Sequence, residues 1–160
     1  MLRRTAFADV AAMFEMQLDE EVNRLSGTIP RGRDAFEAVW KKILETGEAG
    51  GVTPRAIEVD GRLVGMINAF PQEGKACIGY LIAREHWGRG IASEAVRLLL
   101  GEVTVRPLFA RVPVHNVASQ RVLQKNGFEI VERGRSEGTE RYVASEVFLL
   151  RLGEPPVGDA

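Results

Sequence analysis

Two stretches near the start of the chain carry apolar residues every three or four positions, which is the spacing of one helix face. We therefore predict a helix over residues 9–24, with the apolar set Val10, Met13, Phe14, Leu18 and Val22. A second helix is predicted between Asp34, a typical N-cap residue, and Gly47, a typical helix stop. Its buried face would carry Phe36, Val39, Trp40, Ile43 and Leu44. The polar segment 26–33 between them is predicted to be a loop.

From residue 53 onward the pattern becomes that of strands. Two β-rich runs, 55–59 and 62–70, flank Asp60-Gly61, a dipeptide suited to a type I′ turn, and predict a hairpin. The apolar runs "KACIGYLIA" (75–83) and "PLFARVPV" (107–114) predict two further strands, the first of them central in the sheet. The segments 128–135 and 141–152 predict a last strand pair around a polar turn at 136–138.

Two more helices lie between these strands. One is predicted over 91–103, directly after two glycines, and a shorter one runs between Asn116, an N-cap, and Gly127, a stop. The order of elements predicts an α/β (α+β) fold with one mixed, mostly antiparallel central sheet and about four flanking helices. We expect a single domain over 1–152 and a flexible tail over 153–160, which has no apolar pattern.

Composition narrows the class of protein. The chain has 160 residues, 45% of them hydrophobic, and 21 Lys+Arg against 22 Asp+Glu, so there is no basic surplus to neutralise nucleic-acid phosphates. No run approaches the ~20 apolar residues that span a bilayer. The single Cys77 excludes an intramolecular disulfide, and with only His86 and His115 beside it no metal site is expected. The start has no secretory-signal pattern, and we expect a cytoplasmic location.

The stretch "EHWGRGIASEAVRLLL" (85–100) places Gly88 and Gly90 in front of a helix. A helix N-terminus has unpaired N–H groups and partial positive charge, and glycine lets a bulky anion approach them. A plain turn explains the glycines equally well. Two common phosphate motifs are excluded, because Ser93 stands where the dinucleotide fingerprint needs its third glycine and the Lys-Ser/Thr pair of a P-loop is missing.

A second polar stretch, "HNVASQRVLQKNGF" (115–128), follows the strand 107–114. Asn116 and Ser119 both fall at the helix entrance, where they either cap the helix or reach a ligand. Arg121 and Lys125 are four residues apart on one helix face, which is either a solvated stripe or a phosphate contact.

Together, "GYLIAREHWGRGIASEAVRLLL" and "HNVASQRVLQKNGFEIV" resemble the coenzyme-binding core of the GNAT superfamily of N-acetyltransferases, and more narrowly its Rim-type ribosomal-protein acetyltransferase branch. The resemblance extends from the first helix to about Leu152. It implies an acetyl-CoA-dependent N-acetyltransferase that uses no metal. The implied pyrophosphate loop is Trp87, Gly88, Arg89, Gly90, Ile91 and Ala92.

The resemblance also implies roles for residues outside the loop. The backbone of the strand at Tyr80, Leu81 and Ile82 would hold the pantetheine arm, and Asn116 would contact the same arm. Ser119 would lie near the thioester sulfur and act as the catalytic donor to the leaving thiolate. His86 and His115, by contrast, are interpreted as surface residues at strand ends, and Cys77 as core.

The chain departs from the family pattern at several positions. Trp87 replaces the usual Gln or Arg, and "GKACIGY" lacks the glutamate that many relatives carry on this strand. Glu73 and Glu58 are candidates for the general base by vicinity alone, so none is assigned. The family's first strand is almost absent from "MLRR". In the last strand, Ala144 or Ser145 stands where Rim-type relatives often have an aspartate, and both of these departures concern the acceptor side.

The predicted reaction is direct transfer of an acetyl group to a primary amine, either a protein N-terminus or a small molecule, with no acyl-enzyme. The acidic run Asp19, Glu20 and Glu21 either attracts a cationic amine or is a solvated helix face. The sequence leaves open whether the protein forms a homodimer, and neither nucleic acid nor membrane is expected as a partner. The alternative function is a catalytically weak coenzyme-A-binding sensor or regulatory module.

Overall fold

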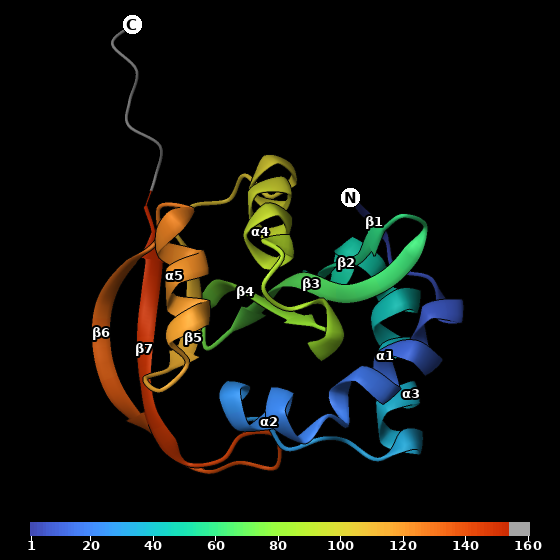
Figure 1. Ribbon diagram of the computed structural model, residues 1–160, viewed down its shortest axis with the longest axis horizontal. Helices are drawn as coiled ribbons and strands as arrows, with labels where there is room; N and C mark the ends of the chain where they lie inside the picture. Colours follow the sequence, from blue (N-terminus) through green and yellow to red (C-terminus); the bar gives the residue numbers. More distant parts are fainter. Residues whose placement is uncertain (154–160) are drawn as a thin grey trace, which may run out of the picture.

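A seven-stranded sheet in the order β1-β2-β3-β4-β5-β7-β6 forms the centre of the molecule (Figure 1). The structure is a computed structural model that describes residues 1–153. Its strands are β1 (Leu2–Arg4), β2 (Thr53–Val59), β3 (Arg62–Gln72), β4 (Lys75–Ile82), β5 (Leu108–Pro113), β6 (Glu129–Ser136) and β7 (Ser145–Leu152). Every neighbouring pair is antiparallel except β4 and β5, which confirms the predicted mixed, mostly antiparallel sheet. The first strand is short but present, paired with β2.

Helices cover both faces of this sheet (Figure 1). They are α1 (Val10–Gln17), α2 (Glu20–Ser26), α3 (Arg33–Thr46), α4 (Ile91–Glu102) and α5 (Val117–Lys125), with short 3-10 turns at Phe7–Asp9, Gly47–Gly50 and Arg84–His86. Buried residues of α4 and α5 pack with one face of the sheet, and those of α1 and α3 pack with the other. None of the helices within residues 1–153 is long and apolar enough to cross a membrane.

The predicted helix over 9–24 is wrong as a single element, because the chain breaks at Asp19. This residue is extended (φ −62°, ψ 122°), and its Oδ1 accepts hydrogen bonds from the backbone N–H groups of Glu21 (2.9 Å) and Val22 (3.2 Å). An aspartate that caps so well starts a new helix rather than continuing the old one. The predicted cap at Asp34 is also wrong. The N-cap of α3 is Gly32, and Asp34 lies exposed in the first turn.

The strand predicted over 141–152 begins only at Ser145. The preceding residues pair instead with the loop that follows α2. The N–H of Ile29 donates to the carbonyl of Arg141 (2.7 Å), and the N–H of Val143 donates to the carbonyl of Gly27 (2.8 Å). Backbone hydrogen bonds to the loop 27–29, which is distant in the sequence, therefore keep residues 141–143 out of β7.

Two apolar clusters make the core. The larger one lies between the sheet and α4 and α5, and its completely buried members include Val96, Leu99, Leu123 and Leu150. The smaller one joins α1 and α3 to β3, with the rings of Phe14 and Phe36 edge to face at 5.6 Å between centroids. Burying a large apolar side chain contributes about 1.5–3 kcal/mol. The interpretation of Cys77 as core is confirmed, since the residue is only 2% exposed.

The sheet is nearly divided between β4 and β5. These two strands pair at one position, Cys77 with Phe109, while β4 pairs with β3 along eight residues and β5 with β7 along six. Beyond Cys77 the edge of β4 that faces β5 therefore has no strand partner among the described residues. All of the predicted tail but its first residue, that is 154–160, lies outside the described residues.

An ion pair ties the first strand to the first helical turn. Both carboxylate oxygens of Asp9 accept from the guanidinium of Arg3 at 2.7 Å, and the backbone N–H of Ala6 donates to the same carboxylate at 2.8 Å. These hydrogen bonds, that of Arg3 foremost, hold the pKa of the Asp9 carboxyl below its usual value. A lowered folded-state pKa stabilises the protein above the unfolded pKa of about 4, and this stability is lost as the pH falls through the folded-state value.

We predict that Asp9→Asn lowers the free energy of unfolding at pH 7 by about 1–3 kcal/mol, because buried charge-assisted hydrogen bonds are lost. Urea denaturation at pH 7 and at pH 3 measures the effect. The difference from the wild type should narrow at pH 3, because the unfolded wild-type chain then takes up a proton at Asp9 that the ion pair of the folded state disfavours. The matched change Asp34→Asn on the exposed turn of α3 should alter stability by no more than about 0.5 kcal/mol. A loss that is equal at both pH values would contradict the role of the ionised pair.

Candidate active site

A cavity of about 340 Å³ opens where β4 and β5 separate. Its walls come from the end of β4, the glycine-containing loop, α2 and the start of α5. Of the ten residues predicted to bind the coenzyme, nine line this cavity: Leu81, Ile82, Trp87, Gly88, Gly90, Ile91, Ala92, Asn116 and Ser119. Arg89 does not line it and is exposed. The fold therefore brings together two motifs that lie more than twenty residues apart in the sequence.

The two glycines at the helix entrance meet both a conformational and a steric requirement. Gly88 (φ 76°) and Gly90 (φ 74°) lie in the left-handed region, and Gly90 is the N-cap of α4. A Cβ added at either position would find no atom within 4 Å. The turn conformation explains the choice of glycine, and the open space in front of a twelve-residue helix N-terminus suits a large anion.

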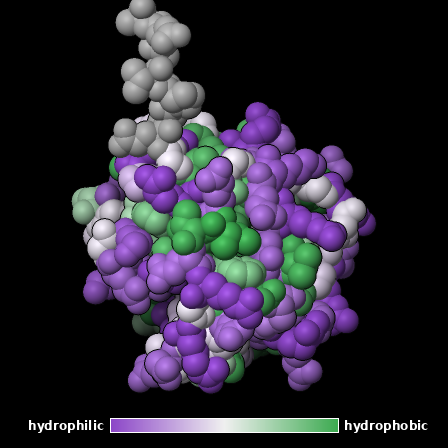
Figure 2. Space-filling model, turned by 90° about the vertical axis from the view of Figure 1, so that its left-hand side faces the viewer, coloured by the Kyte–Doolittle hydropathy of each residue, from purple (hydrophilic) through white to green (hydrophobic). Residues whose placement is uncertain are grey.

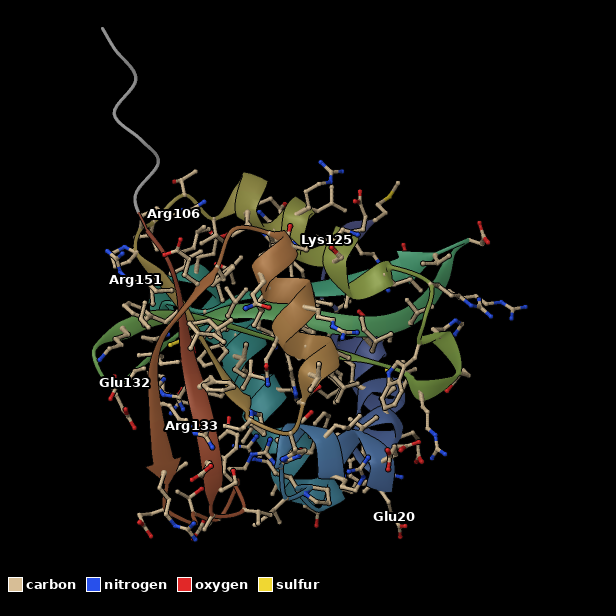
Figure 3. All side chains as sticks on the ribbon, turned by 60° about the vertical axis from the view of Figure 1, so that its left-hand side comes forward. Glu20, Arg106, Lys125, Glu132, Arg133 and Arg151 are labelled. Atoms are coloured by element: carbon tan, nitrogen blue, oxygen red, sulfur yellow. The ribbon has the colours of Figure 1, made fainter. Side chains whose placement is uncertain are left out.

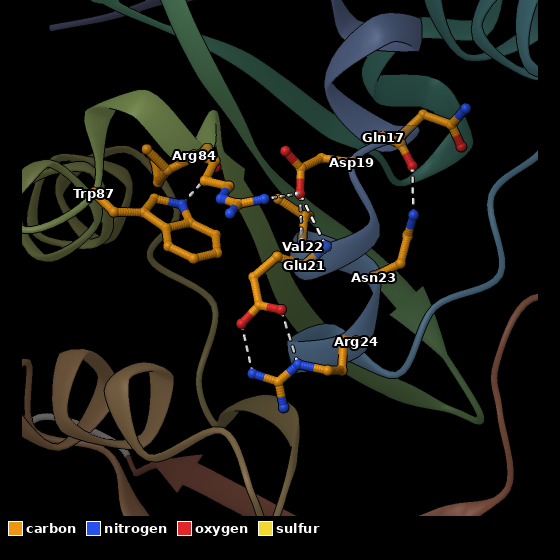
Figure 4. Close-up of polar contacts among 9 residues, drawn as sticks. Gln17, Asp19, Glu21, Val22, Asn23, Arg24, Arg84 and Trp87 are labelled. Carbon is orange, nitrogen blue, oxygen red and sulfur yellow. Dashed lines mark hydrogen bonds and ion pairs between the residues drawn. The ribbon is translucent and has the colours of Figure 1, made fainter.

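Trp87 closes the corner between β4 and this loop. Its indole Nε1–H donates to the carbonyl of Ile82 at 2.8 Å, a bond drawn in Figure 4. The side chain thus fixes the loop to the last residue of the strand. The Gln or Arg usual at this position in the family is therefore replaced by a residue with a structural contact of its own.

Asn116 and Ser119 are joined at the entrance of α5. The side-chain Oδ1 of Asn116 accepts from the backbone N–H of Ser119 at 3.2 Å, so the capping alternative is confirmed. Both residues also line the cavity, and the Nδ2 of Asn116 has no hydrogen-bond partner among the described residues. Capping the helix and facing a ligand are therefore compatible.

Tyr80 adds a third polar group that the sequence interpretation missed. Its hydroxyl lies 2.6 Å from the Oγ of Ser119 and 3.4 Å from the carbonyl oxygen of that residue. Burial raises the pKa of Tyr80 to about 12. The sequence marked this position only as strand backbone, and nothing local to Tyr80 indicated which distant residue its hydroxyl would meet.

The two histidines have different environments. His115 is exposed and its Nε2 lies 2.8 Å from the carbonyl oxygen of Arg24, which links the β5–α5 loop to α2. The surface interpretation of His86 is wrong. The residue is partly buried and lines the cavity, and its Nδ1 is buried without a hydrogen-bond partner among residues 1–153.

The helix α2 supplies a wall that the sequence motifs did not indicate, through Val22, Leu25 and Ser26. Two of the acidic residues at the start of this helix make intramolecular contacts (Figure 4). Asp19 caps the helix and lies 3.6 Å from the guanidinium of Arg84, and Glu21 pairs with Arg24. The hydrogen bond from Arg24 lowers the pKa of Glu21. Arg24 and Arg84 thus already balance two of the three carboxylates, which argues against attraction of a cationic amine.

Arg121 and Lys125 remain outside the cavity. Both are exposed, and Figure 3 shows Lys125 at the end of α5 farthest from α2. The solvated interpretation of this helix face therefore agrees with the structure.

A larger hollow of about 780 Å³ lies on the other side of the β4–β5 gap. We call it the groove; it is lined by the end of α2, the β3–β4 hairpin, β5, β6, β7 and the loop 137–143. Gly79 lines the groove and its neighbour Tyr80 lines the cavity, because successive strand residues point to opposite faces. Ser26 lines both. The two hollows therefore approach each other across the gap in the sheet.

Charges of both signs line the groove. The acidic side chains are Glu73, Glu132 and Glu137, and the basic ones are Lys75, Arg111, Arg135 and Arg141. Figure 3 shows Glu132 on the exposed strand β6. With four cations against three carboxylates, the groove has no acidic excess to attract a polycation.

None of the candidate bases is well placed. Glu73 is exposed and pairs with Arg111 at 2.8 Å, and Glu58 pairs with Arg3 at 3.0 Å on β2, away from both hollows. Cys77 contacts the groove, but burial raises the pKa of its thiol. Of Ala144 and Ser145, the two candidates for the position of the family's aspartate, only Ser145 lines the groove, and it carries a hydroxyl. Among the described residues no group of three or more His, Cys, Asp or Glu could hold a metal ion.

The chain is similar to known N-acetyltransferases in sequence and in fold. Residues 1–129 match the family model described as an acetyltransferase (GNAT) domain. An uncharacterized N-acetyltransferase of Bacillus licheniformis, p20, is 29% identical over 140 residues, which are 80% of this chain and 78% of that protein. The structure of Mycobacterium smegmatis RimJ with a CoA-disulfide has a TM-score of 0.74 at 25% identity, covering 99% of this chain and 84% of that one.

A spermidine N-acetyltransferase from Vibrio cholerae, solved with CoA and spermine, has a TM-score of 0.80 at 14% identity. The match covers 96% of this chain and 95% of that one. At this identity the likeness concerns the fold.

We predict that Gly90→Val weakens the binding of CoA by about tenfold or more. The branched side chain strains a left-handed position and fills the space in front of the α4 N-terminus, so hydrogen bonds to the anion are lost. Isothermal titration calorimetry measures the dissociation constant. Gly101→Val in the last turn of the same helix is the matched control, because its Cβ also points into open space without the left-handed conformation. Wild-type affinity in Gly90→Val would refute the assignment of the loop.

Proposed function

Because the chain belongs to the GNAT acetyltransferase family, we propose that it transfers the acetyl group of acetyl-CoA directly to a primary amine. The observation that carries this proposal is the pair of hollows that approach each other across the β4–β5 gap. The coenzyme would occupy the cavity, with its pyrophosphate on the backbone amides of residues 88–92 and its pantetheine arm along the free edge of β4. The amine would approach from the groove.

Several contacts support direct attack over an acyl-enzyme. The thiol of Cys77 is buried, and its raised pKa keeps it protonated at neutral pH. Among residues 1–153, the Ser119 hydroxyl has no base within hydrogen-bond reach, since the polar side chains that contact this residue are Tyr80 and Asn116. Ser119 then serves as a hydrogen-bond donor to the departing sulfur. A backbone N–H at the free edge of β4 stabilises the oxyanion.

The groove favours an α-amine as the acceptor, such as the N-terminus of a peptide. An amine attacks only when it is neutral, and no assigned carboxylate takes its proton. At pH 7.5 about a third of an α-amine with a pKa of about 7.8 is neutral, against about a thousandth of an alkyl amine with a pKa of about 10.4. The balance of charges in the groove works in the same direction, because it does not attract a polyamine.

The alternative function is a coenzyme-A-binding sensor or regulatory module with weak catalysis. The absence of a carboxylate between Gly74 and Tyr80 favours it. The Ser119–Tyr80 pair in the cavity favours the enzyme instead, because binding alone does not need a hydroxyl donor at the sulfur.

A homodimer and a cytoplasmic location stay predictions. The strand β6 is the surface best suited to a dimer contact, because it lies at the edge of the sheet and almost all of its residues are exposed, including Ile130 and Val131. Figure 2 looks onto this side of the molecule and shows apolar areas bordered by polar side chains.

We predict that a short peptide with a free α-amine is acetylated at least about a hundredfold more efficiently than spermidine at pH 7.5, in terms of kcat/KM. The ratio follows from the neutral fractions of the two amines. Release of CoA thiol measures both reactions, and the same peptide with a blocked N-terminus is the control. The rate with the peptide should rise up to about pH 8 and then level off. Equal efficiency with spermidine would overturn the acceptor proposal, and no thiol release with any amine would favour the sensor.

We predict that Ser119→Ala lowers kcat by about tenfold while the dissociation constant for CoA changes by less than about threefold. The hydroxyl contributes when charge develops on the sulfur, which is a transition-state contact. Steady-state kinetics and calorimetry separate the two quantities. The change Thr104→Ala removes an exposed hydroxyl that lines neither hollow, and it tests whether removal of a hydroxyl in general has this effect. Unchanged turnover in Ser119→Ala would remove this residue from the mechanism.

A further inference from the structure

The contact between Tyr80 and Ser119 joins two sides of the cavity. Tyr80 comes from β4 and Ser119 from the first turn of α5, 39 residues later, and their hydroxyl oxygens lie 2.6 Å apart. Both residues line the cavity. The distance is short even for a hydrogen bond between two hydroxyl groups, so the orientation of one hydroxyl determines that of the other.

Chemistry decides which hydroxyl donates. A phenol is a stronger acid than an alcohol and therefore the better donor. Burial raises the pKa of Tyr80 to about 12, so the phenol keeps its proton at neutral pH. The other acceptor within its reach, the carbonyl of Ser119, is more distant at 3.4 Å. We therefore assign the Tyr80 hydroxyl as the donor of this hydrogen bond and the Oγ of Ser119 as its acceptor.

This orientation leaves the hydrogen of Ser119 free. Its Oγ already accepts from Tyr80, and its backbone N–H donates to Asn116 at 3.2 Å, so the backbone and the side chain of Ser119 each have a fixed partner. A hydroxyl that accepts one hydrogen bond becomes a stronger donor of the next. Without Tyr80, the same hydroxyl would be free to turn toward a nearby backbone carbonyl of its own helix.

We propose that Tyr80 is a positioning residue whose hydroxyl holds Ser119 as a hydrogen-bond donor to the sulfur of the acyl donor. This inference rests on the proposed function. In the reaction, the amine nitrogen forms a bond to the carbonyl carbon, the carbon–sulfur bond breaks, and its electron pair goes to the sulfur. Ser119 stabilises that thiolate, and Tyr80 keeps Ser119 oriented. The ammonium proton passes to water, and the thiolate takes a proton from solvent, so neither hydroxyl changes its protonation state.

A first experiment measures the thiol pKa of bound CoA and needs no acceptor. The thiolate absorbs ultraviolet light, and subtracting the titration of the protein alone removes the contribution of Cys77. In the wild type the bound thiol should have a pKa about one unit below that of free CoA, because a hydrogen bond stabilises the charged form. Tyr80→Phe and Ser119→Ala should each remove most of this shift, and the double variant should resemble Ser119→Ala. Tyr142→Phe on the wall of the groove is the matched control and should leave the shift unchanged.

A second experiment places the same variants in steady-state kinetics. Tyr80→Phe should lower kcat by about tenfold with the KM for acetyl-CoA within about twofold, and should cause no further loss in the Ser119→Ala background. If Tyr80 acted only by packing, the losses of kcat in Tyr80→Phe and Ser119→Ala would multiply in the double variant. The phenyl ring keeps the packing of Tyr80, and the unfolding midpoint of each variant verifies this; if Tyr80→Phe does not fold, the thiol pKa in Ser119→Ala still decides whether Ser119 contacts the sulfur.

The outcomes separate this inference from the proposed function. A wild-type thiol pKa equal to that of free CoA, or a shift unaffected by Tyr80→Phe, would overturn the positioning role even in an active enzyme. A shift that depends on Tyr80, in a protein that acetylates no amine, would support the positioning role and overturn the proposed function.

Discussion

The single paired position between β4 and β5 is the constraint on which the site depends. Each strand is fully paired on its other side, β4 with β3 and β5 with β7, so two well-ordered halves of the sheet meet at Cys77 and Phe109 and then separate. The free backbone groups along the rest of β4 need partners, since buried N–H and C=O groups are costly when unpaired. An extended, polar ligand arm that lies along this edge would supply them.

Three segments that are distant in sequence enclose the gap. The glycine loop and α4 bring the positive end of a helix to it, α5 brings Asn116 and Ser119, and α2 forms the opposite wall. The short α2 is held in place from several sides: by its Asp19 cap, by the contact of His115 with the carbonyl of Arg24, and by backbone pairing of 27–29 with 141–143. The wall shared by the cavity and the groove is therefore tied to the C-terminal hairpin.

Electrostatics differ between the two sides of the gap. On the coenzyme side, the helix N-terminus and the neutral hydroxyls suit an anion and a developing thiolate. On the groove side, the carboxylate of Glu73 in the β3–β4 turn is neutralised by Arg111. The strand β4 carries no carboxylate, and burial raises the pKa of its Cys77 thiol, which keeps the thiol protonated. The described residues thus combine a cavity that suits the proposed coenzyme with a groove in which no carboxylate is assigned as the base.

The amino-acid sequence by itself determined the features that depend on neighbouring residues. The hairpin at Asp60-Gly61, the Asn116 cap and the glycines at the entrance of α4 were all predictable, because φ, capping and alternation are local properties. The two motifs were also enough to predict the fold and nine of the residues that line the cavity.

Tertiary structure alone decided what depends on distant partners. Asp19 ended one helix and began another in place of a continuous apolar face, and residues 141–143 left the predicted strand for the loop after α2. The roles of α2, His86 and Tyr80 in the cavity had no local signal, because each arises from a contact across 39 or more residues or from a cavity wall built by several elements. Spacing along a chain reports which face a residue occupies, but only the packed fold determines what that face meets.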